Sequence, residues 1–235
     1  MVNEKTDPDI CMKRGRIVFS VLFSSSLLWF SEFLMASDCT AVAENVDACE
    51  ITVDSIPASR VLYDGCGQCN TKSTLFMALL RACSIECRIH GFTIHKRLQK
   101  GAMTGLVYLL APENVFHSWV EVHLGDRWYI TEGIILDSRY LSALRRKFPP
   151  HAGPFVGYGV AVKDWKNLNV DFNGNDTFIQ SEGINGDYGV YDSPDDLLSD
   201  HGQEMSHLKA FVYRHIGRHL MNRNVGRTRG CVDRE

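Results

Sequence analysis

Three residues near the middle of the chain could carry out nucleophilic chemistry together, namely Cys69, His117 and Glu132. Cys69 follows Gly67 and Gln68 and opens an apolar run with helical spacing. The helix dipole and the free backbone N–H groups at a helix start stabilise a thiolate. His117 opens a strand-like run and can accept the thiol proton, while Glu132 can orient the imidazole. A cysteine, an imidazole and a carboxylate in this order predict thiol-dependent acyl chemistry.

Three elements must position these residues, and the pattern of apolar residues indicates each of them. A helix is expected over Asn70–Ala82, where apolar residues recur at helical spacing. Alternation predicts a strand over His117–Leu124, and a second strand is expected over Arg127–Glu132. Gly125 and Asp126 separate the two and form a favoured two-residue turn, so the strands should make a hairpin.

The expected hairpin tests the choice of the third residue. With a two-residue turn, Trp119 lies opposite Glu132, and His117 lies on the same face as the diagonal neighbour of Glu132. Diagonal neighbours are roughly 7–8 Å apart at Cα, a gap that a glutamate and an imidazole can bridge. The nearby Asp137 would fall beyond the paired end of the hairpin. Glu132 is therefore the better third residue, although a three-residue turn would reverse the faces.

The remainder of the chain carries further signals for secondary structure. The expected elements are β-rich runs at Cys87–His95 and Val107–Leu110 with a loop over 96–105 between them, a helix over Tyr140–Lys147, irregular structure from 151 to 190, a helix starting at Ser193-Pro194, and a last helix over Met205–Met221. Together these elements predict an α+β fold.

Several short motifs resemble the transglutaminase-like superfamily, which shares its catalytic logic with papain-type cysteine enzymes. The matching residues are Gly67-Gln68-Cys69, Leu80-Arg81-Ala82, Ser84-Ile85-Glu86-Cys87-Arg88 where the family usually reads Gly-Ile-Pro-Ala-Arg, His117-Ser118-Trp119-Val120-Glu121-Val122, Arg127-Trp128, and a carboxylate four residues after that tryptophan. The family normally has aspartate at this last position, and this chain has Glu132. The resemblance extends over residues 55–137.

The resemblance implies a fold and a reaction. The fold would be a papain-like core, in which a helix bearing Cys69 packs on an antiparallel sheet bearing His117 and Glu132, with a C-terminal helical extension. Cys69 would attack an amide or ester carbonyl to form a thioester, which water or an amine would resolve. The substrates would be a peptide, a protein or a small amide, with an amine as co-substrate, and no metal or other cofactor is expected.

The composition bounds the protein class and its compartment. The chain has 235 residues, of which 45% are hydrophobic, and a net charge of −3, so no nucleic-acid partner is expected. The expected organisation is a tail and apolar helix at 1–37, the catalytic core at 38–140 and an extension at 141–235. The run Ile17 to Ala36 is signal-like, which leaves secretion open, but a buried or surface-docked helix is favoured over a membrane role. A reduced nucleophile favours the cytoplasm.

Two other function classes remain open at this point. One is a non-catalytic binding or scaffold protein of the same fold. The other is a thiol redox or zinc protein that uses Cys66 and Cys69, since the pair has a Cys-x-x-Cys spacing. A four-thiolate zinc site with Cys83 and Cys87 is disfavoured, because Cys69 and Cys83 would lie at opposite ends of one helix, roughly 20 Å apart.

Overall fold

The computed structural model describes residues 25–49, 55–202, 211 and 213–230. The helices are α2 (Ser25–Glu44), α3 (Ala58–Asp64), α4 (Cys69–Ala82), α5 (Gly105–Leu110), α6 (Ser138–Lys147), α7 (Pro194–Asp200) and α9 (Arg218–Gly230), with short turns η1 (Lys96–Gln99), η2 (Glu132–Ile135), η3 (Ser181–Gly183) and η4 (Tyr213–Gly217). The strands are β1 (Asp47–Ala48), β2 (Cys66–Gly67), β3 (Cys87–His95), β4 (Asn114–Leu124), β5 (Arg127–Ile130), β6 (Phe155–Gly157), β7 (Val160–Val162) and β8 (Ile184–Tyr191). The fold is α+β.

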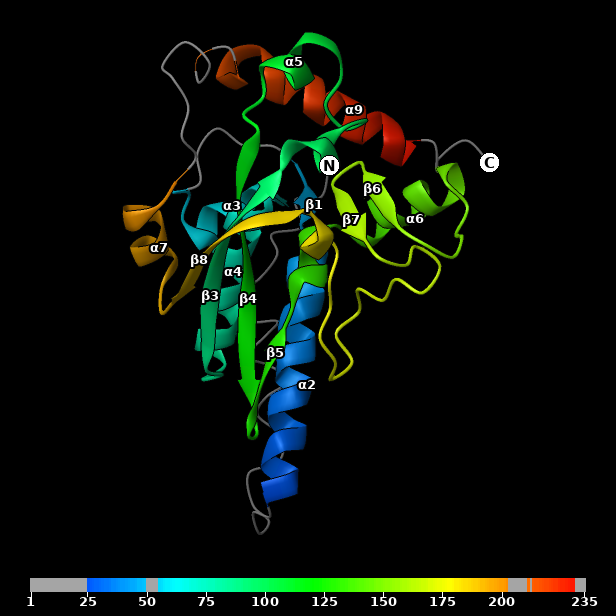
Figure 1. The fold of residues 1–235 in the computed structure, drawn as a ribbon. Helices are drawn as coiled ribbons and strands as arrows, with labels where there is room; N and C mark the ends of the chain where they lie inside the picture. The colour runs from blue at the N-terminus through cyan, green and yellow to red at the C-terminus, as the bar shows by residue number, and fades with distance from the viewer. Residues whose placement is uncertain (1–24, 50–54, 203–210, 212, 231–235) are drawn as a thin grey trace, which may run out of the picture.

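The main sheet has the strand order β5-β4-β3-β8, and all neighbouring strands are antiparallel. Helix α4 packs on β4 and β3, and α2 packs on α4 (Figure 1). The side chains between these helices and the sheet include Phe76, Leu80, Val120 and Val122, all of them fully or almost fully buried. A helix on one face of an antiparallel sheet therefore forms the core, in the expected papain-like arrangement.

The hairpin that was predicted from the sequence is confirmed in its turn and its register. Leu124 pairs with Arg127 and Glu121 pairs with Ile130, which is the register of a two-residue turn. The extent of the second strand was wrong, because β5 ends at Ile130 and Glu132 begins the turn η2. The backbone N–H of Glu132 donates to the carbonyl of Thr177 at 3.3 Å, so a distant segment bonds to the chain where the hairpin stops.

Other elements differ from the sequence-based expectations. The run Val107–Leu110 lies in helix α5 rather than in a strand, because a short apolar run has no periodicity that separates the two. The stretch from 151 to 190 is not wholly irregular, since it contains β6 and β7 and most of β8, the fourth strand of the sheet. The predicted last helix Met205–Met221 begins among residues outside the described ranges, and helical structure continues from Tyr213 to Gly230.

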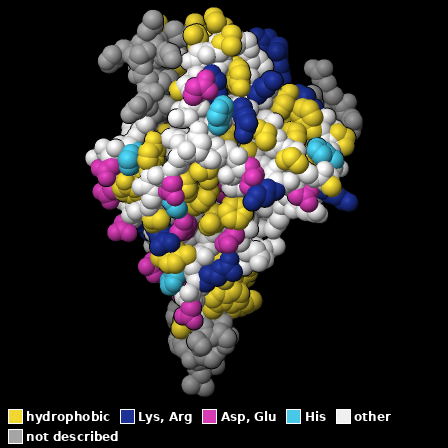
Figure 2. Space-filling view, viewed as in Figure 1, with side chains coloured by type: hydrophobic (Ala, Val, Ile, Leu, Met, Phe, Trp, Pro, Cys, Tyr) yellow, Lys and Arg dark blue, Asp and Glu magenta, His cyan; other side chains and the backbone are white. Residues whose placement is uncertain are grey.

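The described part of the signal-like segment is the start of α2. This helix docks on the protein surface, with Trp29 and Phe33 packed against the core and Leu28 and Phe30 exposed. Residues 17–24 of the segment lie outside the described ranges. Among the helices that the structure describes, none combines the length and the apolar character needed to cross a bilayer. Charged side chains of both signs are interspersed with apolar ones on the face shown in Figure 2.

One lysine lies within the core at the first turn of α4. Lys72 is fully buried, and its Nζ donates to the carbonyl oxygen of Val46 at 2.9 Å. Burial disfavours the charged form and lowers the pKa of Lys72 from 10.5 to about 8. The ammonium group is therefore held at an energetic cost at neutral pH.

We expect Lys72 to make the free energy of unfolding depend on pH in the alkaline range. Between about pH 8 and 10.5 the unfolded chain binds more protons at this residue than the folded chain, so stability should rise with pH through this window. Urea unfolding of the wild type and of Lys72→Met at pH 8 and 10 measures the effect. The variant, which cannot titrate at this position, should lack the increase, and equal pH dependence in both proteins would contradict the buried-lysine explanation.

Candidate active site

Cys69 is the first residue of α4, as expected from the sequence. The preceding residue, Gln68, caps the helix, and its backbone N–H donates to the hydroxyl of Thr71 at 3.1 Å. Glycine at position 67 lets the chain pass close to the helix, because a Cβ atom there would lie 3.0 Å from side-chain atoms of Thr71 and Lys72. The thiol of Cys69 is half-buried. Because Cys69 is the first residue of α4, its thiol lies at the N-terminal end of the helix dipole, where negative charge is stabilised.

The segment before Cys69 is cross-linked to the chain near α2. Strand β2 pairs in parallel with β1, which brings Cys66 beside Asp47, and Cys66 forms a disulfide with Cys49 across a Cα–Cα distance of 5.7 Å. The alternative in which Cys66 and Cys69 form a redox pair or a zinc site is therefore wrong, because the sulfur of Cys66 is already bonded. The Cys-x-x-Cys spacing suggested Cys69 as the partner of Cys66, because a local spacing carries no information about the parallel pairing of β2 with the distant strand β1.

His117 and Glu132 are in direct contact. Both side chains are fully buried, and Nε2 of His117 lies 3.0 Å from Oε1 of Glu132. The second carboxylate oxygen of Glu132 accepts a hydrogen bond from the backbone N–H of Ile179 at 2.8 Å. Among the described residues, Nδ1 of His117 has no hydrogen-bond partner although it is buried. Since Glu132 occupies Nε2, Nδ1 is the nitrogen that could exchange a proton with a thiol.

Cys69 is joined to the strand of His117 through two polar residues. The thiol donates to Oδ1 of Asn70 at 3.6 Å, and the same oxygen accepts the hydroxyl hydrogen of Ser118 at 2.9 Å. Asn70 follows the cysteine and Ser118 follows the histidine, so the start of α4 is fastened to β4 next to both residues. The structure thus brings His117 and Glu132 together directly and joins Cys69 to them through this contact. The thiol and Nδ1 are not hydrogen-bonded to each other, which is common in sites without substrate.

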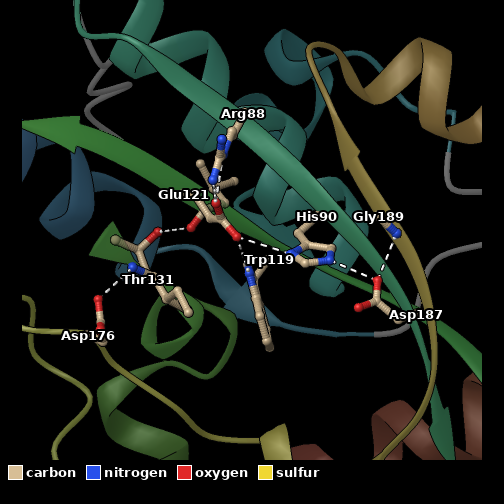
Figure 3. Close-up of polar contacts among 10 residues, drawn as sticks. Arg88, His90, Trp119, Glu121, Thr131, Asp176, Asp187 and Gly189 are labelled. Atoms are coloured by element: carbon tan, nitrogen blue, oxygen red, sulfur yellow. Dashed lines mark hydrogen bonds and ion pairs between the residues drawn. The ribbon is translucent and has the colours of Figure 1, made fainter. Parts of the chain in front are cut away.

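The face of the sheet that bears His117 carries a second group of charged residues. Glu121 on β4 forms an ion pair with Arg88 at 2.6 Å and a hydrogen bond with Nδ1 of His90 at 3.1 Å, and Nε2 of His90 bonds Asp187 on β8 at 2.9 Å (Figure 3). Burial opposes ionisation of Glu121, but the hydrogen bonds from His90 and Arg88 outweigh it and lower the pKa of Glu121 from 4.5 to about 2. These bonds tie β4, β3 and β8 together beside His117.

Asp137, the acid that the hairpin register disfavoured as a catalytic residue, has a structural environment. It caps α6 by accepting the backbone N–H of Tyr140 at 2.8 Å, and it also accepts the backbone N–H of Ala48 at 3.0 Å. Its carboxylate forms a buried ion pair with Arg229 on α9. Burial opposes ionisation, yet the bonds from Arg229 and the two N–H groups prevail and lower the pKa of Asp137 below its ordinary range.

A cavity of about 140 Å³ lies next to Cys69. Its wall includes Cys69 and Gln68 from the start of α4, Gln180 from the segment after Ile179, and Met221 from α9. Neither Gln180 nor Ile179 was singled out in the sequence. Both belong to a Gly- and Asn-rich stretch without a period or motif, so no local signal could have identified them.

Part of the chain is similar in sequence to a known protein family. Residues 39–132 match the sequence model of the transglutaminase-like superfamily, an interval that contains Cys69, His117 and Glu132. A search of curated proteins found no match. The crystal structure of a candidate cysteine protease from Cytophaga hutchinsonii is similar at 16% identity and a TM-score of 0.36, over 81% of this chain and 49% of that one, so the chain spans about half the length of that protein. Residues 39–132 are thus similar to the transglutaminase-like superfamily, the family that the sequence motifs resemble.

Proposed function

We propose that this protein is a cysteine-dependent enzyme that transfers the acyl group of an amide to water or to an amine through a thioester on Cys69. The observation that carries the proposal is the buried pair of His117 and Glu132, which lies beside a helix-start cysteine. Nδ1 of His117 has no hydrogen-bond partner in the described part of the chain. The position of all three residues within the interval that matches the superfamily gives further support.

In the first half of the proposed reaction, Nδ1 of His117 takes the thiol proton of Cys69, and the thiolate attacks the carbonyl carbon of the amide. The backbone N–H of Cys69, at the first turn of α4, is the candidate donor to the oxyanion. Collapse of the adduct breaks the C–N bond, and the imidazolium returns the proton to the leaving amine. Glu132 would hold the ring in the tautomer with hydrogen on Nε2 and stabilise the imidazolium.

In the second half, His117 would take a proton from water or from an amine, which then attacks the thioester carbonyl. The C–S bond breaks and the thiolate of Cys69 is restored. Water gives hydrolysis and an amine gives transfer. Peptides, proteins and small amides are the proposed acyl donors, since each contains the carbonyl that the thiolate attacks.

The compartment is part of the proposal. The cytoplasmic expectation rested on the need for a reduced thiol at Cys69. The disulfide between Cys49 and Cys66 supports the alternative that the sequence left open, because structural disulfides persist in oxidising compartments and are rare in the cytosol. We therefore favour an oxidising compartment, in which Cys66 is bonded to Cys49 and cannot form a disulfide with Cys69.

Thiol modification combined with an acyl-transfer assay tests the proposal. Iodoacetamide at a low ratio should modify Cys69 roughly tenfold faster than Cys83, because the helix dipole favours a thiolate at the N-terminal end of α4 only. Cys83 is the comparison thiol, since it is also half-buried and caps the other end of the same helix, with its Sγ 3.5 Å from the Sγ of Cys39. Peptide mapping by mass spectrometry measures both rates.

The same protein is then given casein with dansylcadaverine, and incorporated fluorescence reports transfer. Formation of the thioester from glutamine releases ammonia in both reactions, so ammonia in excess of the incorporated fluorophore reports glutamine hydrolysis. We expect one of the two activities before modification and neither after one equivalent of label at Cys69. A protein that is labelled selectively at Cys69 but cleaves and transfers nothing, on casein or on a panel of peptide amides and esters, would instead be a scaffold. Equal labelling of Cys69 and Cys83 would contradict the nucleophile assignment.

A further inference from the structure

The cavity beside Cys69 has the size and the wall of a pocket for one apolar group. Its volume is about 140 Å³, and an apolar protein cavity of about 150 Å³ is known to accept benzene. Apart from a few polar groups its wall is apolar, with contributions from β3, β4, η2 and α9. Residues of this wall include Ile94, Phe116, Ile135, Leu136, Met221 and Val225.

The C-terminal helix forms one side of this pocket. Met221 and Val225, one turn apart on α9, are both buried, and both line the cavity. The helix is held in this position by Asn224, whose side chain donates to the carbonyl of Ala102 at 3.0 Å, and by the ion pair at its C-terminal end. One side of the pocket wall is thus built by α9, which lies in the extension that follows the matched residues 39–132.

One polar group in the wall carries an unused acceptor. Gln180 is 4% exposed and lines the cavity, and its Nε2 donates to the carbonyl of Gly159 at 2.7 Å. Its Oε1 is buried and has no hydrogen bond among the described residues. Because the bond to Gly159 fixes the amide, Oε1 remains an acceptor, and a buried acceptor without a donor is unfavourable. Gln180 also follows Ile179, whose backbone N–H donates to Glu132. The residue that carries this acceptor is therefore next in sequence to the one that binds the proposed catalytic carboxylate.

We propose that this cavity binds one apolar side chain of a peptide acyl donor, up to the size of a phenyl ring, and that Oε1 of Gln180 accepts a hydrogen bond from an amide N–H of the same donor. The inference rests on the proposed function, since it places the donor beside Cys69. The substrate class is then a peptide amide with an aromatic or large aliphatic residue next to the reacting carbonyl, rather than a charged or very small amide.

Three chloroacetamides that differ in one feature each test the pocket. The thiolate of Cys69 displaces chloride from each of them, so that an S–C bond forms and a C–Cl bond breaks. N-benzyl-2-chloroacetamide has the ring and the N–H, N-benzyl-N-methyl-2-chloroacetamide lacks the N–H, and 2-chloroacetamide lacks the ring. Half-saturation of Cys69 labelling should need a concentration roughly tenfold lower for the benzyl compound than for either of the others.

Variants of the wall should change these values in opposite directions. Val225→Phe fills the cavity and should raise the half-saturation concentration of the benzyl compound. Val225→Ala enlarges the cavity and should lower the half-saturation concentration of an N-naphthylmethyl analogue. Opposite signs cannot arise from partial unfolding. In Gln180→Met, the benzyl compound and its N-methyl analogue should label Cys69 equally well, and both should still label it better than 2-chloroacetamide. Leu220→Phe is the matched control on the same helix, since Leu220 is 43% exposed and does not line the cavity, and it should change neither value.

A non-covalent measurement separates the pocket from the chemistry. In Cys69→Ala, N-benzylacetamide should shift the methyl resonance of ¹³C-labelled Met221 while an exposed methionine such as Met35 stays unchanged. If casein and peptides are not turned over but Met221 shifts, the proposed function fails and the pocket stands. If Cys69 is reactive but the ring gives no advantage and Met221 does not shift, the pocket is overturned and the proposed function is unaffected.

Discussion

Replacing Glu132 with glutamine is expected to lower kcat by about 10³–10⁴-fold, the loss seen when the acid of such a triad becomes an amide. The substitution hardly changes the shape of the side chain. It does change which atoms can accept hydrogen bonds, and both oxygens of Glu132 are acceptors in this structure, one toward His117 and one toward the N–H of Ile179.

The geometry determines how glutamine would fail. Its single oxygen must stay on the side of Ile179, where a backbone N–H needs an acceptor, so its NH₂ group would face Nε2 of His117. Nε2 would then have to be the acceptor, and the proton would move to Nδ1. Nδ1 could no longer take the proton of Cys69, and the stabilisation of the imidazolium would be lost as well.

Steady-state kinetics of amine incorporation or amide hydrolysis measures the effect, with Cys69→Ala as the zero-activity baseline. Glu132→Asp restores the usual family residue on a shorter arm and should retain partial activity. The melting temperature should be recorded for each variant, since Glu132 is fully buried. A Glu132→Gln enzyme that folds and turns over normally would exclude Glu132 as the third catalytic residue.

Replacing Asp137 with asparagine is expected to lower the stability of the fold by about 3 kcal/mol, because it leaves the partner of a buried ion pair without its counter-charge. The side chains of Asp137 and Arg229 are 4% and 12% exposed, so solvent screens them little. For a chain of this length the loss corresponds to a fall in melting temperature of roughly 6–12 °C. kcat measured below the transition should fall far less than in Glu132→Gln.

Thermal unfolding of Asp64→Asn provides the control. Asp64 pairs with Arg60 on exposed helix α3, where an i,i+4 pair contributes at most about 0.5 kcal/mol. The effect of Asp137 should also depend on pH. Its folded pKa lies below the ordinary value of 3.8, so its contribution is fully present above that pH and is lost as the pH falls through the folded pKa. Wild type and Asp137→Asn should therefore converge in acid, and a difference that is constant down to pH 2 would contradict this explanation.

Local patterns predicted the parts of the site that depend on nearby residues. The helix start at Cys69 and the hairpin register both follow from a few consecutive residues, and both are observed. The contact of His117 with Glu132 is observed too, although Glu132 reaches the imidazole from the turn η2 rather than from a strand. The contact was predicted correctly although β5 is shorter than expected, because the hairpin register continues to Thr131, whose N–H donates to the carbonyl of Val120.

Contacts between distant segments could not be predicted in this way. The bond from Ile179 to Glu132 spans 47 residues, and the ion pair of Arg229 with Asp137 spans 92. Each depends on the whole chain having folded, and neither segment has a motif. The helix α5 was mistaken for a strand for a related reason, since an apolar run of four residues takes its structure from its surroundings rather than from its own pattern.

The disulfide that precedes α4 gives the two ends of the same short segment opposite chemical requirements. As the proposed nucleophile, Cys69 acts only as a reduced thiolate, whereas Cys66, three residues earlier, is oxidised in the disulfide that joins β2 to the chain after β1. A strong reductant, the usual additive for thiol enzymes, would protect the first residue and release the second. The protein is thus suited to a redox buffer of intermediate reduction potential, and the surrounding ratio of reduced to oxidised glutathione would act on both the disulfide and the proposed nucleophile.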